Sequence, residues 1–222
     1  DADFSETGGW IGTLGVYTTN FNEGKLNSGI SRHASRDLTD MVMTELQHDL
    51  SAKYGRQWNR RGMWNRNYSE TRLPAVPSMI LEILSHQNFA DMRMGHDPNF
   101  KFTVARSVYK AILKHTATMH GTDYVVQPLP VTRFAIEEGS KHTFRLSWQG
   151  VVDPQEPTAH PRGYIVYTRL GHGGWDNGTY VKDNYYTFQA EPGLVYSFKV
   201  SAVNKGGESF PAEILAAYHA KK

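Results

Sequence analysis

The stretch PSMILEILSHQNFADM, residues 77–92, places one carboxylate, Glu82, inside a run of aliphatic side chains. A strand that lies between two helical layers is buried on both faces and normally contains only Val, Ile and Leu. An ionised carboxylate without a partner in such a strand would be strongly unfavourable or would take up a proton. We therefore expect Glu82 to lie at an open end of its strand, where the polar residues SHQN, 85–88, begin.

The segments around this stretch alternate between strand and helix patterns. Residues 12–20, GTLGVYTTN, are β-branched and aromatic and are flanked by turn residues, which is typical of a strand. Apolar residues then recur at helical spacing over residues 38–54, and Gly55 ends the pattern. Residues 76–84 are the aliphatic strand that carries Glu82. Strands that alternate with helices indicate an α/β layer with parallel strand pairing.

A second helix is predicted after HDP, residues 96–98. Asp97 is a candidate N-cap, and Pro98 suits a first helical turn. The apolar residues expected on the buried face of this helix are Val104, Val108, Ile112 and Leu113.

The composition changes at residues 120–130, HGTDYVVQPLP, where one glycine and two prolines follow the helical pattern. After this point the apolar residues alternate with a period of two, which indicates short strands in a β-sandwich. The strand candidates are residues 142–149, 163–170, 185–190 and 194–204. We therefore predict an α/β domain over residues 1–122 and an all-β domain over residues 123–222.

Composition excludes some classes of function. The 24 Lys and Arg nearly balance the 22 Asp and Glu, so no net field favours a nucleic acid partner. No apolar stretch approaches the ~20 residues that a membrane-spanning helix needs. There is no cysteine, which excludes disulfides and thiol chemistry. The chain begins with Asp1 and no leader pattern follows, so we expect it to be part of a longer protein with further domains.

The stretch PGLVYSFKVSAVNKGGES, residues 192–209, resembles the fibronectin type III domain. Tyr196 follows a Pro-Gly pair and precedes a strand of alternating apolar residues, and a Gly-rich turn comes after Asn204. Trp148, Tyr164 and Val166 supply the core positions that the resemblance implies. In such sandwiches a tyrosine at the corner bonds back to the backbone, and the resemblance gives this role to Tyr196. The resemblance implies a spacer or docking module.

The segment from Gly12 to about His115 looks like the C-terminal half of the zinc-dependent N-acetylmuramoyl-L-alanine amidases. Their closing motif runs P-A-x-L-x-E-x-G-F-x-S-N-x-x-D, and the residues that fall on it without a gap are Pro77, Glu82, Asn88 and Asp91. The chain departs from the motif where Leu84-Ser85 replace Gly-Phe and where Gln87 replaces Ser. This variant is similar to a branch in secreted proteins of Bacteroidetes that are often labelled xanthan lyases, although no residue here supports a lyase.

The resemblance implies a fold and an activity. The fold is a partial amidase-like sheet with flanking helices, N-terminally truncated in this chain, followed by the fibronectin type III sandwich. Glu82 would be the catalytic base, and Arg72 and Asn88 would bind the substrate, which is peptidoglycan or another cell-surface glycan. Zinc would activate the attacking water, with its ligands expected upstream of Asp1 and with His86 as the internal candidate. The protein would be secreted, periplasmic or at the cell surface.

Two alternatives remain open from the sequence. Glu82 could be a structural residue that is paired with a nearby arginine, for which Arg72 and Arg93 are the candidates. The whole protein could then be a non-catalytic glycan-binding or scaffolding protein with a degenerate amidase-like domain.

Overall fold

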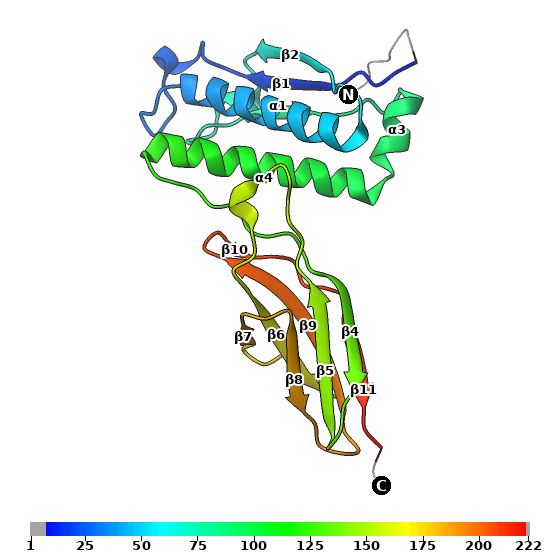
Figure 1. Cartoon of the computed structure of the whole chain (residues 1–222). Helices are drawn as coiled ribbons and strands as arrows, with labels where there is room; N and C mark the ends of the chain where they lie inside the picture. Colours follow the sequence, from blue (N-terminus) through cyan, green and yellow to red (C-terminus); the bar gives the residue numbers. More distant parts are fainter. Residues whose placement is uncertain (1–7, 221–222) are drawn as a thin grey trace. The chain divides into compact units, whose positions relative to one another are not determined.

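The computed structural model describes residues 8–220, which form two compact units, Asp1–Asp123 and Tyr124–Lys222 (Figure 1). The boundary predicted from the sequence lies between residues 122 and 123. None of the helices in the described part of the chain is both long and apolar enough to span a bilayer.

The N-terminal unit is built from three strands and four α-helices within residues 8–123. Its elements in chain order are β1 (Thr13–Tyr17), a short 3-10 helix η1 (Asn22–Gly24), α1 (His33–Tyr54), β2 (Arg60–Asn65), α2 (Ser69–Arg72), β3 (Ile80–Glu82), α3 (Phe89–Gly95) and α4 (Pro98–His120).

The two long helices, α1 and α4, lie side by side (Figure 1). α1 ends at Gly55, whose φ of 64° is the left-handed conformation that glycine adopts without strain. Asp97 caps α4, because its carboxylate accepts a hydrogen bond of 2.9 Å from the backbone N–H of Asn99. Both predicted helices and both end signals are confirmed. The face predicted for α4 is wrong at Ile112, which is exposed.

The three strands form one mixed sheet in the order β2-β1-β3. β1 and β2 are parallel, whereas β3 runs antiparallel to β1, with Leu14 opposite Glu82 and Val16 opposite Ile80. The expectation of parallel pairing is therefore wrong for β3. The carboxyl end of β3, which carries Glu82, lies beside the amino-terminal end of β1.

One face of this sheet packs against α1. A Cβ added to Gly15 would collide with the side chain of Thr39 on α1, so β1 and the helix approach closely there. Leu81 on β3 packs into the same core. The buried members of this core are Leu38, Val42, Leu46, Leu50, Trp58, Phe100, Val104 and Ala111.

A buried ion pair joins the two long helices. Lys110 on α4 lies 2.8 Å from the carboxylate of Asp49 on α1, and the two side chains are 1% and 4% exposed. Ser107 donates a hydrogen bond of 2.6 Å to the same carboxylate, and Glu45 lies 3.4 Å from Lys110. Burial raises the pKa of Asp49, but the bonds to Lys110 and Ser107 outweigh it, so the pKa lies below its usual value.

The C-terminal unit is an antiparallel sandwich of two sheets, as the period-two pattern predicted. One sheet has the order β4-β5-β8, and the other has the order β10-β9-β6-β7 with β11 also paired to β9. The strands are β4 (Thr132–Glu138), β5 (Thr143–Gln149), β6 (Gly163–Leu170), β7 (Thr179–Val181), β8 (Tyr185–Gln189), β9 (Val195–Asn204), β10 (Gly207–Glu208) and β11 (Leu215–Tyr218), and a 3-10 helix, η2 (Pro157–Ala159), precedes β6.

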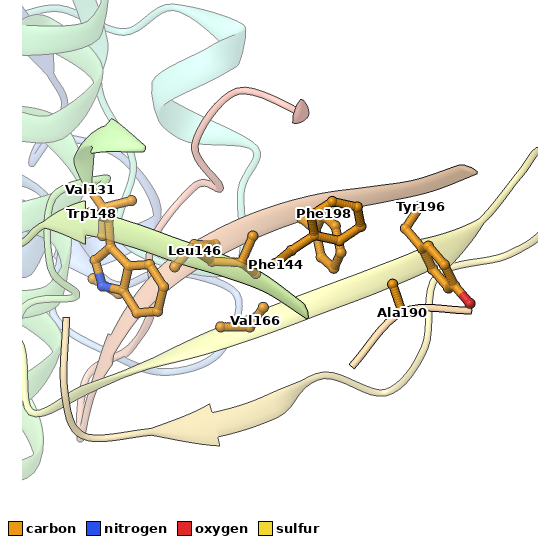
Figure 2. Close-up of a cluster of buried hydrophobic side chains, with 10 residues drawn as sticks. Val131, Phe144, Leu146, Trp148, Val166, Ala190, Tyr196 and Phe198 are labelled. Carbon is orange, nitrogen blue, oxygen red and sulfur yellow. The ribbon is translucent and has the colours of Figure 1, made fainter. Parts of the chain in front are cut away.

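Figure 2 shows the core between the two sheets, in which Phe198 of β9 faces Phe144 and Leu146 of β5. The hydroxyl of Tyr196 accepts a hydrogen bond of 3.2 Å from the backbone N–H of Glu191. The corner role predicted for Tyr196 is therefore confirmed.

Candidate functional site

A β-bulge determines which side chains share a face with Glu82. Along the β1–β2 pair, Thr13 lies opposite Arg60 and Leu14 lies opposite Gly62, so Arg61 is one extra residue on β2. Bulges redirect side chains and are common beside functional sites. Before the bulge, Arg60 points toward α1, where it contacts Asp40.

Beyond the bulge, the residues of β2 that face away from α1 include Gly62 and Trp64. A Cβ added to Gly62 would lie 3.5 Å from both the Leu14 side chain and the Trp64 indole, which places these side chains on one face. Leu14 is paired with Glu82 on the other neighbouring strand, so Glu82 lies on this face as well. Glu82, Leu14 and the Trp64 indole therefore lie on the face opposite α1, where Leu14 is buried and Glu82 and Trp64 are partly exposed.

Arg61 reaches Glu82 from the strand beyond β1. Its Nη2 lies 3.3 Å from Glu82 Oε2, and the two side chains are 19% and 33% exposed. The pair thus spans the width of β1 and remains partly open to solvent. Glu82 is neither an isolated buried charge nor a fully buried ion pair. The sequence left open an arginine partner for Glu82, with Arg72 and Arg93 as the candidates, and the partner in the structure is Arg61.

Arg72 is used elsewhere in the unit. Its guanidinium lies over the ring of Phe21 at 6.0 Å and donates to the carbonyl of Asn67 at 3.4 Å. Its backbone carbonyl accepts a hydrogen bond of 2.7 Å from the buried Arg32. The structure therefore gives Arg72 a role in holding the loops around α2, and its predicted contact with substrate stays a prediction.

Asn88, the other predicted substrate-binding residue, is the N-cap of α3. Its Oδ1 accepts hydrogen bonds from the backbone N–H groups of Ala90 and Asp91, at 2.9 and 3.3 Å. Its Nδ2 donates to the carbonyl of Gly9 at 2.9 Å. The amide of Asn88 is thus engaged in fastening α3 to the segment that precedes β1.

Asp91 makes the same connection from a fully buried position. Its carboxylate accepts from the backbone N–H of Ser85 at 2.9 Å and from that of Ile11 at 3.3 Å. Burial raises the pKa of Asp91, although these two bonds and the charge of Arg61 oppose the rise. Together Asn88 and Asp91 tie the chain just after Glu82 to residues 9–11, and this fixes the end of β3 beside the start of β1.

The zinc that the resemblance implies finds no site in the described part of the chain. Within residues 8–220, no group of three His, Asp or Glu side chains is placed to hold a metal ion. His86 is exposed, and the charged group that contacts Glu82 is a cation, Arg61. The donor set of residues 8–220 therefore does not fit a zinc centre, and the ligands expected upstream of Asp1 lie outside this range.

No model of a protein family matches the chain, and no curated protein matches it either. Among solved structures, the chain is similar to the twitchin kinase region from C. elegans, with 24% identity, a TM-score of 0.37 and coverage of 42% of this chain and 17% of that one. It is also similar to chicken CNTN1 FN1–FN3 domains, with 17% identity, a TM-score of 0.38 and coverage of 45% and 34%.

A third similar structure is the third fibronectin III domain of the human KIAA0343 protein, with 13% identity, a TM-score of 0.38 and coverage of 45% of this chain and 88% of that domain. The chain spans less than two thirds of the length of the twitchin and CNTN1 structures. The names of these three structures include fibronectin type III domains. TM-scores at this level do not extend the likeness to function.

Proposed function

We propose that the N-terminal unit carries the general base of a secreted hydrolase that cleaves the N-acetylmuramoyl-L-alanine amide of peptidoglycan, with Glu82 as that base. The observation that supports this proposal best is the exposure of Glu82. A carboxylate in an aliphatic strand is one-third open to solvent at a strand end, and a bulge brings an arginine to it. The motif positions around Glu82 are also occupied by residues that fix its strand in place.

In this proposal Glu82 accepts a proton from a water molecule as the water oxygen bonds to the amide carbonyl carbon. When the C–N bond breaks, Glu82 returns that proton to the leaving nitrogen, and the products are a carboxylic acid and the free amino group of L-alanine. Arg61 donates to one oxygen of Glu82 and thereby holds the carboxylate in a fixed orientation. Residues 8–220 supply the base, and the groups that polarise the carbonyl and lower the pKa of the water, including any zinc, would come from outside this range.

The test uses the full-length protein that contains this chain, with purified peptidoglycan as substrate. The measurement is the release of L-alanine amino termini, detected by amine labelling and mass spectrometry. We expect Glu82→Gln to abolish release while the circular dichroism spectrum and thermal transition stay unchanged. Release that persists in Glu82→Gln would contradict the assignment of the base.

Arg60 and Arg61 supply a matched pair of controls, because they are neighbours in sequence on opposite faces of the sheet. We expect Arg61→Met to lower the rate of release and Arg60→Met to leave it nearly unchanged. Equal effects of the two substitutions would mean that proximity to Glu82 does not matter.

A second candidate function is a non-catalytic glycan-binding or scaffolding role, which the Arg61–Glu82 pair itself favours. An ion pair satisfies the carboxylate without any chemistry, and exposed pairs contribute only about 0–1 kcal/mol to stability. For this role we expect no release of L-alanine by the full-length protein, retained binding to peptidoglycan in a pull-down assay, and no loss of that binding in Glu82→Gln.

A further inference from the structure

Trp64 is the exposed member of the five tryptophans, all of which lie in the described part of the chain. Its relative exposure is 47%, whereas Trp58 and Trp148 are buried. Trp10 packs against Trp58 in a tilted arrangement, and the cations of Arg169 and Lys199 lie over the Trp175 ring at 4.8 and 4.7 Å. The large apolar surface of Trp64 is therefore the one that the fold leaves open to a ligand.

The indole of Trp64 leans toward the row of the sheet that contains Glu82. A Cβ added to Gly62 would lie 3.5 Å from Trp64 Nε1 and 3.8 Å from Cδ1, so the pyrrole edge of the ring lies over Gly62. Gly62, Leu14 and Glu82 are paired across the three strands. Because neighbouring strands are about 4.8 Å apart, this row spans about 10 Å from Gly62 to Glu82. The indole and the Arg61–Glu82 pair thus border one surface.

The chemistry of this surface suits a sugar ring. One side of a pyranose presents C–H groups that pack favourably against the electron-rich face of an indole. Its hydroxyl and acetamido groups need donors and acceptors at the rim. The indole Nε1–H and Arg61 are donors, Glu82 is an acceptor, and the guanidinium of Arg66 lies 5.9 Å from the indole centroid. Leu14, at the centre of this row, is 1% exposed, so a ligand stacked on the indole would lie beside the Arg61–Glu82 pair and not over the row itself.

We propose that Trp64 is the stacking platform of a subsite for an N-acetylated pyranose, with Arg61 and Glu82 bonding to the polar groups of the same ligand. This inference rests on the proposed function and specifies its substrate. The amide that Glu82 attacks would be presented on a glycan, and the sugar bound at Trp64 would be the one next to the scissile bond. Stem peptides without the sugar would bind much more weakly.

The experiment is a titration of the full chain with a soluble N-acetylglucosaminyl-N-acetylmuramoyl-L-alanine fragment, followed by the indole N–H signals in ¹⁵N–¹H NMR spectra. The signal that disappears in Trp64→Phe identifies Trp64. We expect this signal to shift on addition of the fragment, and the other four indole signals to move less. The dipeptide L-alanyl-D-glutamate, added alone, should leave the Trp64 signal in place.

Two variants test the contribution of the ring to affinity. We expect Trp64→Ala to weaken binding of the fragment at least about tenfold, which corresponds to about 1.4 kcal/mol. Phe102→Ala removes another exposed aromatic ring, from α4, and should leave binding unchanged. Equal affinity of Trp64→Ala and the wild type, or a fragment-induced shift that is confined to other tryptophans, would overturn the subsite.

Glu82→Gln separates this inference from the proposed function. If Glu82→Gln retains hydrolysis while Trp64→Ala loses binding, the subsite is supported and the assignment of the base fails. If Glu82→Gln loses hydrolysis and Trp64→Ala binds the fragment normally, the base is supported and the subsite is refuted.

Discussion

Replacing Lys110 by methionine should destabilise the N-terminal unit by about 3 kcal/mol at neutral pH. The Nζ of Lys110 lies 2.8 Å from Asp49, and both side chains are almost fully buried. Removing one partner of a buried pair costs about 3–5 kcal/mol, because the remaining charge is left without compensation. Ser107 still donates to Asp49 at 2.6 Å, which places the expected loss at the low end of this range.

The pH dependence of this loss gives a sharper test than its size. In the wild type the pKa of Asp49 is lowered on folding, so the ionised carboxylate stabilises the folded state at pH values above its pKa in the unfolded chain. This stabilisation is lost as the pH falls through the pKa of Asp49 in the folded state. In the variant Lys110→Met the lysine no longer lowers the pKa of Asp49, so we expect burial to raise this pKa above its usual value. Stability of the variant is then highest in acid and declines as the pH rises through the raised pKa. We therefore expect the difference between the two proteins to shrink toward pH ~4.

The assay is hydrogen–deuterium exchange in a urea series, read by mass spectrometry on peptides from α1 and α4. Peptides from the sandwich serve as an internal control, because unfolding of two units does not follow a single two-state transition. The double variant Lys110→Met/Asp49→Leu should recover most of the loss, since it removes both charges. A loss below about 1 kcal/mol for the single variant, or a loss that grows in acid, would refute the reasoning.

Three further predictions concern single contacts. Tyr196→Phe should destabilise the sandwich by about 0.5–1.5 kcal/mol, because the partly buried hydrogen bond from the N–H of Glu191 is lost, and urea unfolding followed by exchange in β9 measures this loss. Gly12→Ala should cost about 2 kcal/mol or more, because its φ is +86° and the new Cβ would meet the carbonyl oxygen of Asn59; a thermal melt of the variant checks this. Asp91→Leu should cost about 2 kcal/mol, because two backbone N–H groups lose their acceptor, and faster exchange at residues 83–88 should accompany the loss. Unchanged stability in any of these variants would contradict the role assigned to that contact.

The long helices and the sandwich strands were predictable because their signals are local. The period of the apolar residues, Gly55 after α1 and Asp97 before α4 act within a few residues of the backbone that they determine. The strands β5, β6, β8 and β9 follow alternation within each segment. The short edge strands β7 and β10, with three and two residues, are too short to show a period.

The arrangement around Glu82 was less predictable because it depends on contacts between distant segments. Periodicity identifies a strand but does not give its direction, so the antiparallel pairing of β3 was missed. Arg61 was missed as the partner because a bulge, which sequence alone does not reveal, turns it toward Glu82. Asn88 carries a visible N-cap signal before α3, but its second bond, to Gly9, spans 79 positions.

The extra residue in β2 has a consequence for how related chains could differ. Deleting Arg61 would remove the extra residue, restore the strict two-residue alternation between Arg60 and Gly62, and leave the rest of β2 in its present register. A change in loop or strand length, rather than a substitution, would then remove the cation from beside Glu82. In a sequence alignment this deletion would appear as a one-residue gap, although it would leave Glu82 without its paired cation.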